Sequence, residues 1–310
     1  MKIRVLLFYK YVNIKNPEAL ALSHLEFCKK LGILGKVLVA KEGINGSISG
    51  TKTQVTKYKS QLKKDKRFKD IVFKEDIELT HPFTRMAVRV KEEIVALKQK
   101  VNLKNKGIYI SPKKFLEVYK KEKDKIGKDI IILDARNNYE SRVGKFKNSL
   151  TPNISTFREF PKALKLLKGK EDKKIITYCT GGIRCEKASA FLKQSGFKKV
   201  YQLEGGIVSF AKKFPDTVWE GKCFVFDKRM LSSVNTKDSK IGNCEVCFLP
   251  CNLYRNCKNF SCDKLTLICL NCEKRMNGCC SSKCLNEFRE GCMKKALFMQ
   301  NKSRKIETIC

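Results

Sequence analysis

The sequence predicts a mixed α/β protein built from three units. Two observations predict this division: the order of expected strands and helices changes at Ser111, and eleven of the sixteen cysteines fall between Cys244 and Cys292. Alternating strands and helices imply a largely parallel sheet, whereas clustered cysteines indicate a separate small module. The predicted limits are an α+β domain at residues 1–98, a linker at 99–110, a parallel-sheet α/β domain at 111–225 and a cysteine-rich module at 226–310.

Residues 1–98 show the strand and helix order β-α-β-β-α-β. The helix over 17–31 is the best marked, because Asn16 stands at its N-cap and Gly32 follows its end. Asn45–Gly46 predicts a tight turn between two strands. The order is that of the ferredoxin-like arrangement, which binds RNA or protein in some proteins and is only a platform in others. The expected strands are 4–11, 35–40, 46–49, 71–75 and 86–90, and the second helix is 53–64.

From Ser111 onward, short apolar strands alternate with helices. This alternation predicts a parallel sheet covered by helices on both faces. In such sheets, binding and catalytic sites form at the carboxyl ends of strands, and Cys179 directly follows the strand 175–178. The expected strands are 130–133, 175–178 and 200–203, and the expected helices are 113–121, 161–167 and 186–194.

The segment around Cys179 favours thiolate chemistry. The adjacent Gly181 and Gly182 let the backbone turn sharply and direct N–H groups inward, and the helix that follows adds the positive end of its dipole. Such surroundings lower the pKa of a cysteine thiol and hold a bound anion. The alternative is a strand-turn-helix junction with an inert, buried cysteine.

Three segments, in the right order, resemble the rhodanese domain: Asp134-Ala135-Arg136 at a strand end, the loop 179–184, and the Leu-x-Gly-Gly element that begins at Leu203. Asp134 and Arg136 are expected to fix the fold beneath the loop through an ion pair and hydrogen bonds. Cys185 is either a resolving thiol for Cys179 or a small buried residue in the first turn of the helix.

Loop length separates two chemistries on this architecture. A phosphatase loop needs five residues between its cysteine and its arginine to surround a phosphate, whereas four separate Cys179 from Arg184. The shorter loop fits a single terminal sulfur, so a persulfide on Cys179 is expected, with the charge of Arg184 favouring its anion. The expected cradle is the backbone of Thr180, Gly181, Gly182, Ile183, Arg184 and Cys185.

The whole chain resembles the bacterial rhodanese-domain tRNA uridine hydroxylases. The resemblance rests on the loop at 179–185, the segment Ala-Lys-Glu-Gly-Ile-Asn-Gly at 40–46 and the cysteine-rich tail. It implies hydroxylation of the wobble uridine (position 34) of tRNA to 5-hydroxyuridine, with molecular oxygen as co-substrate, a persulfide at Cys179 and the tRNA anticodon arm as partner. Two other functions stay open: a sulfurtransferase that moves sulfane sulfur to an acceptor, as in tRNA thiolation, and a non-enzymatic adaptor that binds RNA or protein.

The cysteine-rich module has the ligand order of two cross-braced metal sites. So small a segment buries too little apolar surface to fold without metal, and zinc is the expected ion. An iron–sulfur cluster, or reduced cysteines in an ordinary core, are the alternatives. The predicted sets are Cys244, Cys247, Cys269 and Cys272 for one site, and Cys257, Cys262, Cys280 and Cys284 for the other, with Cys279 as the alternative to Cys280.

Composition predicts the class of binding partner and the cellular location. The 66 Lys and Arg residues exceed the 31 Asp and Glu residues by 35 charges, which favours a polyanion such as RNA. The lysines are spread along the chain, so the codon usage of an AT-rich genome explains part of this excess. No apolar run reaches the roughly 20 residues that span a bilayer, and no secretory signal pattern opens the chain. A cytoplasmic location is expected, where clustered cysteines bind metal or catalyse rather than form disulfides.

Overall fold

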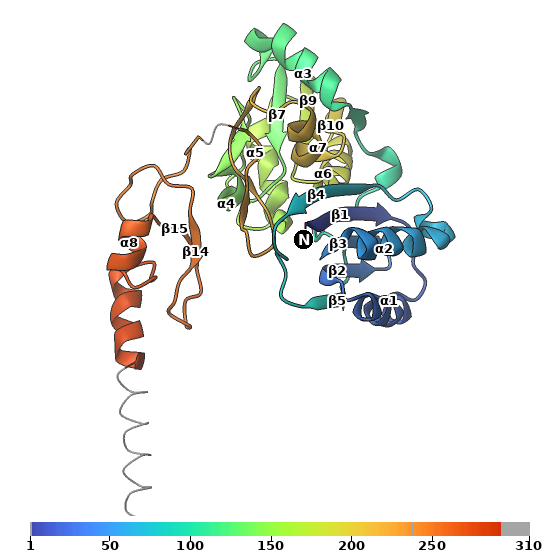
Figure 1. Cartoon of the computed structure of the whole chain (residues 1–310). Coiled ribbons are helices and arrows are strands. Elements are labelled where there is room, and N and C mark those ends of the chain that lie inside the picture. The colour runs from blue at the N-terminus through green and yellow to red at the C-terminus, as the bar shows by residue number, and fades with distance from the viewer. Residues whose placement is uncertain (1, 237–238, 293–310) are drawn as a thin grey trace, which may run out of the picture.

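The computed structural model describes residues 2–236 and 239–292, which form three units (Figure 1). The N-terminal unit lies against one end of the central unit, and the cysteine-rich module, with helix α8 (Leu270–Arg275), stands to one side. Residues 293–310, which the sequence assigned to that module, lie outside the described part of the chain. Within the described residues, no helix has the length and apolarity needed to cross a membrane.

The N-terminal unit is a five-stranded sheet with two helices on one face. Its elements are β1 (Ile3–Tyr11), α1 (Pro17–Leu31), β2 (Leu34–Ala40), β3 (Gly43–Gly50), α2 (Lys52–Lys64), a 3-10 turn (Lys66–Phe68), β4 (Phe73–Glu78) and β5 (Met86–Val90). The strand order is β4-β1-β3-β2-β5: the first four strands form the predicted antiparallel ferredoxin-like sheet, and β5 adds parallel to β2. Leu6 and Phe8 of β1 are buried in the core under the helices. The alternate residues Leu7 and Tyr9 therefore lie on the opposite face of the sheet.

The hairpin between β2 and β3 turns at residues 41–42, so the turn predicted at Asn45–Gly46 is wrong. Asn45 and Gly46 lie inside β3, where Asn45 donates a hydrogen bond to the carbonyl of Ile94 over 3.0 Å. The ring of Phe8 packs against Gly46, and a Cβ on this glycine would lie 2.4 Å from Phe8 Cζ. Close packing against an aromatic ring, and not a turn, explains this glycine.

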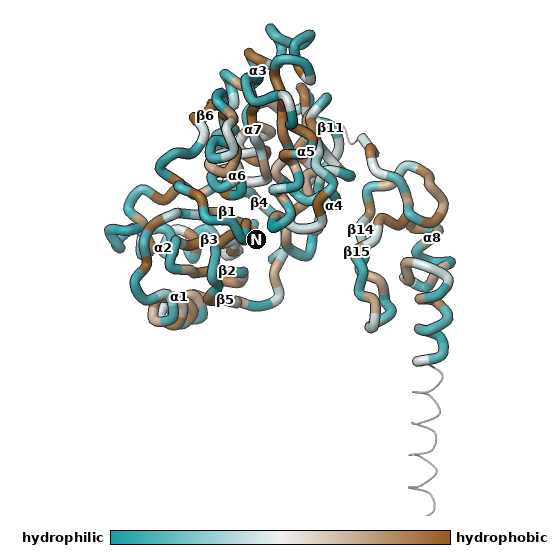
Figure 2. Tube along the Cα trace, turned by 180° about the vertical axis from the view of Figure 1, so that it is seen from behind, coloured by the Kyte–Doolittle hydropathy of each residue, from teal (hydrophilic) through white to brown (hydrophobic). Residues whose placement is uncertain are grey.

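The central unit is a four-stranded parallel sheet with helices on both faces, as predicted. Its elements are β6 (Ile108–Ile110), α3 (Pro112–Lys121), β7 (Ile130–Asp134), α4 (Asn138–Ser141), β8 (Gly144–Phe146), α5 (Ala163–Leu167), β9 (Lys174–Tyr178), α6 (Ile183–Gln194), β10 (Lys199–Leu203) and α7 (Gly206–Lys213), with 3-10 turns at Leu103–Asn105, Lys123–Lys125 and Phe157–Lys162. The sheet order is β6-β10-β9-β7. Ile130 and Ile132 of β7 join the core under α3 and α7, whereas Ile131 and Leu133 join the core under α5 and α6. Figure 2 shows hydrophobic segments of the chain, in brown, within the central unit.

The edge strand β6 comes from residues that the sequence assigned to the linker 99–110. Ile108 pairs with Tyr201, and Ile110 pairs with Leu203. A three-residue strand is too short for the alternation of side chains to reveal it in the sequence. The open edge of β10 offers the unpaired backbone groups that hold these residues in an extended conformation.

The C-terminal residues form short hairpins around a core made largely of cysteines. The elements before α8 are β11 (Trp219–Gly221), which pairs with β8 of the central unit, β12 (Cys223–Phe224) with β13 (Leu231–Ser232), and β14 (Tyr254–Asn256) with β15 (Leu265–Leu267); residues 282–292 are also helical. The core of this module combines its cysteines with Ile268, Met276 and Leu285. So few apolar side chains give too small a core to stabilise the module alone.

Candidate active site and cysteine clusters

The side chain of Cys179 is fully buried at the carboxyl end of β9, and backbone groups surround its sulfur. The N–H of Gly182 donates a hydrogen bond to Sγ over 3.1 Å. The N–H groups of Arg184 and Cys185 and the thiol of Cys185 also act on this sulfur and favour its charged form. The loop between β9 and α6 is therefore built to hold an anionic sulfur.

Two glycines permit this tight loop. Gly182, at the N-cap of α6, has a φ of +98°, which residues with a Cβ rarely adopt. Gly206, at the start of α7, lies directly against the loop, because a Cβ there would be 2.4 Å from the carbonyl oxygen of Cys179. The next N–H, that of Ile207, donates to the same carbonyl over 3.0 Å. The Leu-x-Gly-Gly segment thus supports the cysteine loop through close backbone contact.

The environment of Cys179 favours the thiolate. Burial disfavours the charged form, but the hydrogen bond from the Cys185 thiol, the charge of Arg184 and the loop N–H groups outweigh it and lower the pKa of Cys179 to about 6. The pKa of Cys185 moves in the opposite direction, well above its usual value, because this thiol is buried and hydrogen-bonded to Cys179. At neutral pH Cys179 is a thiolate and Cys185 remains a thiol that donates to it.

We expect the ultraviolet absorbance of the Cys179 thiolate to rise through a midpoint near pH 6. The difference between wild type and Cys179→Ser isolates this signal from the other cysteines. Cys185→Ala is expected to move the midpoint upward, because it removes one hydrogen-bond donor to the thiolate. A wild-type midpoint near the ordinary thiol value of about 8.5 would contradict this description of the loop.

Arg184 is paired with a buried carboxylate that the sequence analysis did not assign. Its guanidinium donates to both oxygens of Glu140, over 2.5 Å and 2.8 Å, and the Thr180 hydroxyl donates to Glu140 over 3.3 Å. Although burial opposes ionisation, the charge of Arg184 keeps the pKa of Glu140 below its usual value. The positive charge of Arg184, which was expected to favour the anionic sulfur, is therefore shared between that sulfur and Glu140. Glu140 also fixes the loop to α4.

Glu140→Gln is expected to lower the free energy of unfolding by about 3 kcal/mol or more, because it leaves the buried Arg184 without a counter-charge. The same change should lower the pKa of Cys179 further, since the guanidinium charge then acts on the sulfur alone. Thermal unfolding and the thiolate titration measure the two effects. The control is Glu117→Gln, which breaks an exposed pair with Lys114 and should change stability by no more than about 0.5 kcal/mol. Equal effects of both substitutions would contradict the role of Glu140.

Asp134 and Arg136 lie beneath the loop in a second buried ion pair. Arg136 donates to Asp134 through Nε and Nη2, over 2.9 Å and 2.7 Å, and to the carbonyl of Gly144 over 2.6 Å. Its guanidinium also lies 5.6 Å from the ring centre of Tyr178 and 5.2 Å from that of Trp219. These contacts join β7, β8, β9 and β11 below the site, which fits the supporting role expected of both residues.

The N-terminal sheet covers the cysteine loop with the face that its own helices leave free. β1 and β4 are the strands nearest the central unit in Figure 1. Leu7 lies over Gly181, where a Cβ would be 2.8 Å from Leu7 Cδ2. The Tyr9 hydroxyl donates to Glu186 over 3.0 Å, and that of Tyr11 to the carbonyl of Ile183 over 3.3 Å. We call this face, with Leu7, Tyr9, Tyr11 and Lys74, the roof of the site.

A buried lysine fixes the two units to each other. The side chain of Lys187 on α6 is 4% exposed and donates to Glu42 over 2.8 Å and to Glu93 over 2.6 Å. Both carboxylates belong to the N-terminal part of the chain, which the lysine therefore holds against the helix that begins at the cysteine loop. The ferredoxin-like unit is in this way part of the surroundings of the cysteine loop.

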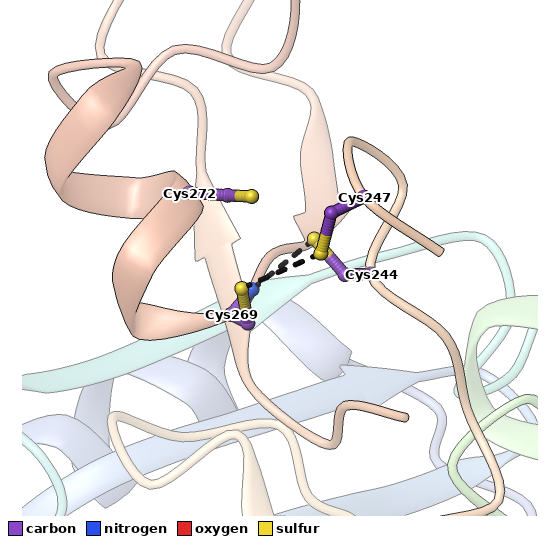
Figure 3. A group of neighbouring side chains, drawn as sticks. All are labelled: Cys244, Cys247, Cys269 and Cys272. Carbon is purple, nitrogen blue, oxygen red and sulfur yellow. Dashed lines mark hydrogen bonds between the residues drawn. The ribbon is translucent and has the colours of Figure 1, made fainter. Parts of the chain in front are cut away.

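The structure brings together the two sets of cysteines that the spacing predicted. Figure 3 shows the side chains of the first set pointing toward one another, from a loop, from the start of α8 and from α8 itself. Within each set, the four Sγ atoms lie within 4.8 Å of one another. Cys279 is buried but belongs to neither set, whereas Cys280 belongs to the second. The two sets are Cys244, Cys247, Cys269 and Cys272, and Cys257, Cys262, Cys280 and Cys284.

The spacing of the sulfur atoms fits a tetrahedral metal ion. Cys247 and Cys269 are 3.7 Å apart at Sγ, as are Cys262 and Cys280. A tetrahedron of thiolates with Zn–S bonds of about 2.3 Å has edges of about 3.8 Å. In addition, the N–H of Cys269 donates to Cys244 Sγ over 3.4 Å, as expected for a sulfur that carries negative charge. The donor set is all thiolate, and both clusters can hold a metal ion.

Known protein families match the chain in three consecutive parts. The UPF0176 acylphosphatase like domain matches residues 3–94, the rhodanese-like domain matches 112–213 and the rhodanase C-terminal family matches 220–285. A protein of Onion yellows phytoplasma (strain OY-M) named tRNA uridine(34) hydroxylase is 44% identical over 302 residues, which cover 94% of this chain and 95% of that protein. The chain belongs to the tRNA uridine(34) hydroxylase family.

Other members of the tRNA uridine(34) hydroxylase family match over a similar extent. The protein of that name from Bacillus licheniformis is 45% identical over 288 residues, covering 91% of this chain and 88% of the relative. The one from Staphylococcus saprophyticus is 42% identical over 320 aligned residues, covering 100% of this chain and 98% of the relative. The resemblance predicted from the cysteine loop, the N-terminal segment and the cysteine-rich tail is thus confirmed.

Proposed function

We propose that this chain hydroxylates C5 of uridine at position 34 of tRNA, with molecular oxygen as co-substrate and a two-electron reductant that takes the second oxygen atom to water. The observation that carries this proposal is the match along almost the whole chain to relatives named tRNA uridine(34) hydroxylase. A match to the rhodanese-like domain alone would support only a sulfur-handling site. The N-terminal and C-terminal parts of the match are what favour hydroxylation over plain sulfur transfer.

In this proposal Cys179 is the catalytic residue and carries the persulfide. The backbone of Thr180, Gly181, Gly182, Ile183, Arg184 and Cys185 is its cradle. The contacts of the loop support this role, because they place N–H groups and one thiol around a single sulfur atom. Cys185 acts as a hydrogen-bond donor to that sulfur. Asp134 and Arg136 hold the strand ends below the loop and do not take part in the chemistry.

The tRNA partner binds by its anticodon arm, with the basic flanking units as the surface that meets its phosphates. The excess of 35 positive charges supports a polyanionic partner. A cytoplasmic location, where tRNA is modified, is part of the same proposal. The domain limits at 1–98, 111–225 and 226–310 stay a prediction.

We assign zinc to both cysteine clusters. Zinc suits an all-thiolate tetrahedral set and needs no redox change, and the cysteine-rich module has few other core residues. The metal supplies folding energy to the module and no chemistry to the reaction. Cys244, Cys247, Cys269 and Cys272 would hold one ion, and Cys257, Cys262, Cys280 and Cys284 the other.

Cells that lack the chain test the function directly. Their tRNA should lose 5-hydroxyuridine and nucleosides derived from it, and a plasmid copy of the wild-type chain should restore them. Nucleoside analysis of digested tRNA by mass spectrometry measures both. An unchanged nucleoside profile in the deletion strain would overturn the proposal.

A further inference from the structure

A cavity of about 300 Å³ lies between the roof and the chain that follows the central sheet. Thr180 of the cysteine loop lines it, so the cavity reaches the site directly. Val5 and Leu7 of β1 line it from the N-terminal unit, and Val225 and Phe226 from the chain after β12. The volume is at the lower end of the range for pockets that hold small ligands.

Phe226 is an exposed aromatic ring held in a fixed position. It is 61% exposed, although it lies beside the active loop. The buried ring of Phe224 contacts it edge-on at a centroid distance of 5.3 Å, and the Arg184 guanidinium lies 5.8 Å from its centre. An aromatic ring with neighbours that orient it is a platform on which a planar base can stack.

The roof places a cation at the same cavity. Lys74 of β4 lines it and also lines a second cavity, of about 440 Å³, to which Tyr9 and Tyr11 of the roof contribute as well. Its amine lies 5.3 Å from the centre of the Tyr9 ring, and among the described residues it makes no ion pair. The negative charges that act on its amine are those of Cys179, Glu186 and Glu204. Lys74 is therefore available to donate to the carbonyl oxygens of a bound ring.

The chemistry of the walls favours a nucleobase over an aliphatic ligand. Apolar side chains of β1 and the Phe226 ring suit the faces of a flat ring, and Lys74, Ser47 and Thr180 offer polar groups for its edge. A base in a single-stranded loop is unpaired, so turning it into a pocket costs little. The cavity also borders the loop that holds the reactive sulfur, and the base must lie beside this loop to react.

We propose that this cavity receives the uracil ring of the substrate nucleotide, turned out of the anticodon loop and stacked on Phe226, with Lys74 at its edge. This inference rests on the proposed function. Phe226 and Lys74 are positioning residues, because they orient the ring and do not hold the reacting sulfur. The N-terminal unit then contributes one wall of the substrate pocket.

The test compares two anticodon-arm RNAs, one with uridine and one with an abasic nucleotide at the target position. Wild type should bind the uridine RNA roughly 5- to 150-fold more tightly, the range expected for one stacked base. Phe226→Ala should remove this preference and lower kcat/KM by a similar factor. Phe226→Tyr, which keeps the ring, should restore both. Leu166→Ala, at an exposed apolar side chain on α5, serves as the matched control and should bind like wild type.

The binding comparison distinguishes a wrong pocket assignment from a wrong proposed function. If wild type hydroxylates tRNA but Phe226→Ala keeps its preference for uridine, the pocket assignment is wrong while the function stands. A wild-type chain that hydroxylates tRNA without preferring the uridine RNA would overturn the pocket equally. If wild type neither binds nor hydroxylates tRNA, the proposed function is wrong, and the pocket assignment that rests on it is wrong as well.

Discussion

Cys179→Ser is expected to abolish hydroxylation of tRNA, with a fall in rate of roughly a thousandfold or more. A serine hydroxyl cannot carry a sulfane sulfur, and at neutral pH it remains protonated in a loop built around an anion. The fold should be unaffected, because oxygen replaces sulfur of similar size in a loop held by backbone contacts. The measurement is the amount of 5-hydroxyuridine formed per chain in purified tRNA, together with the mass of the intact protein.

Two controls accompany this substitution. Wild type treated with a sulfur donor should gain the mass of one sulfur atom, and Cys179→Ser should not. Cys292→Ser removes an exposed thiol far along the chain and should leave the hydroxylation rate unchanged. Full activity of Cys179→Ser would exclude a catalytic role for this residue.

Loss of one cluster ligand should have the largest effect on stability. Cys272→Ser is expected to unfold the cysteine-rich module, because binding of a structural zinc ion contributes about 10–16 kcal/mol to the folding of small domains. Cys272 is buried and lies in the first cluster. Metal analysis of the purified chain should find zinc in wild type and half as much, or less, in the variant. Limited proteolysis should cut the variant within the module.

Cys251→Ala is the matched control for this experiment. Cys251 is buried in the same module but belongs to neither cluster. Its replacement should keep the metal content and cost about 1 kcal/mol, as small changes in a core do. A visible absorbance band and bound iron in wild type would instead assign iron–sulfur clusters. A metal-free module that resists proteolysis would contradict any structural metal.

The cysteine clusters and the reactive loop were predictable because their signals are local or ordered along the chain. The alternating pairs of cysteines indicate the two ligand sets of a cross-braced module, although spacing alone does not choose between the adjacent Cys279 and Cys280. In the same way, the glycines after Cys179 indicate the N–H groups near its sulfur. The alternation of apolar strands and helices predicted the parallel sheet and therefore the edge on which Cys179 lies.

The partners of the loop were not predictable, because they come from distant parts of the chain. Glu140 stands 44 residues before Arg184, and a glutamate in a short helix carries no signal of a buried ion pair. The roof contacts of Leu7 and Tyr9 depend on how two units dock, which periodicity within each unit does not encode. The error at Asn45–Gly46 has the same origin, since the ring of Phe8 is what requires the glycine. At Gly46, tertiary packing against Phe8, and not the geometry of a turn, explains the glycine.

In the proposed function, the Cys179 site uses molecular oxygen to hydroxylate uridine 34 of tRNA. The most direct test incubates the purified wild-type chain, unmodified tRNA, a sulfur donor and a two-electron reductant under isotopically heavy dioxygen, and then measures the masses of the tRNA nucleosides by mass spectrometry. We expect 5-hydroxyuridine that carries one heavy oxygen atom, formed by wild type and not by Cys179→Ser. A thiolated nucleoside in its place, or a hydroxyl oxygen that comes from water, would contradict it.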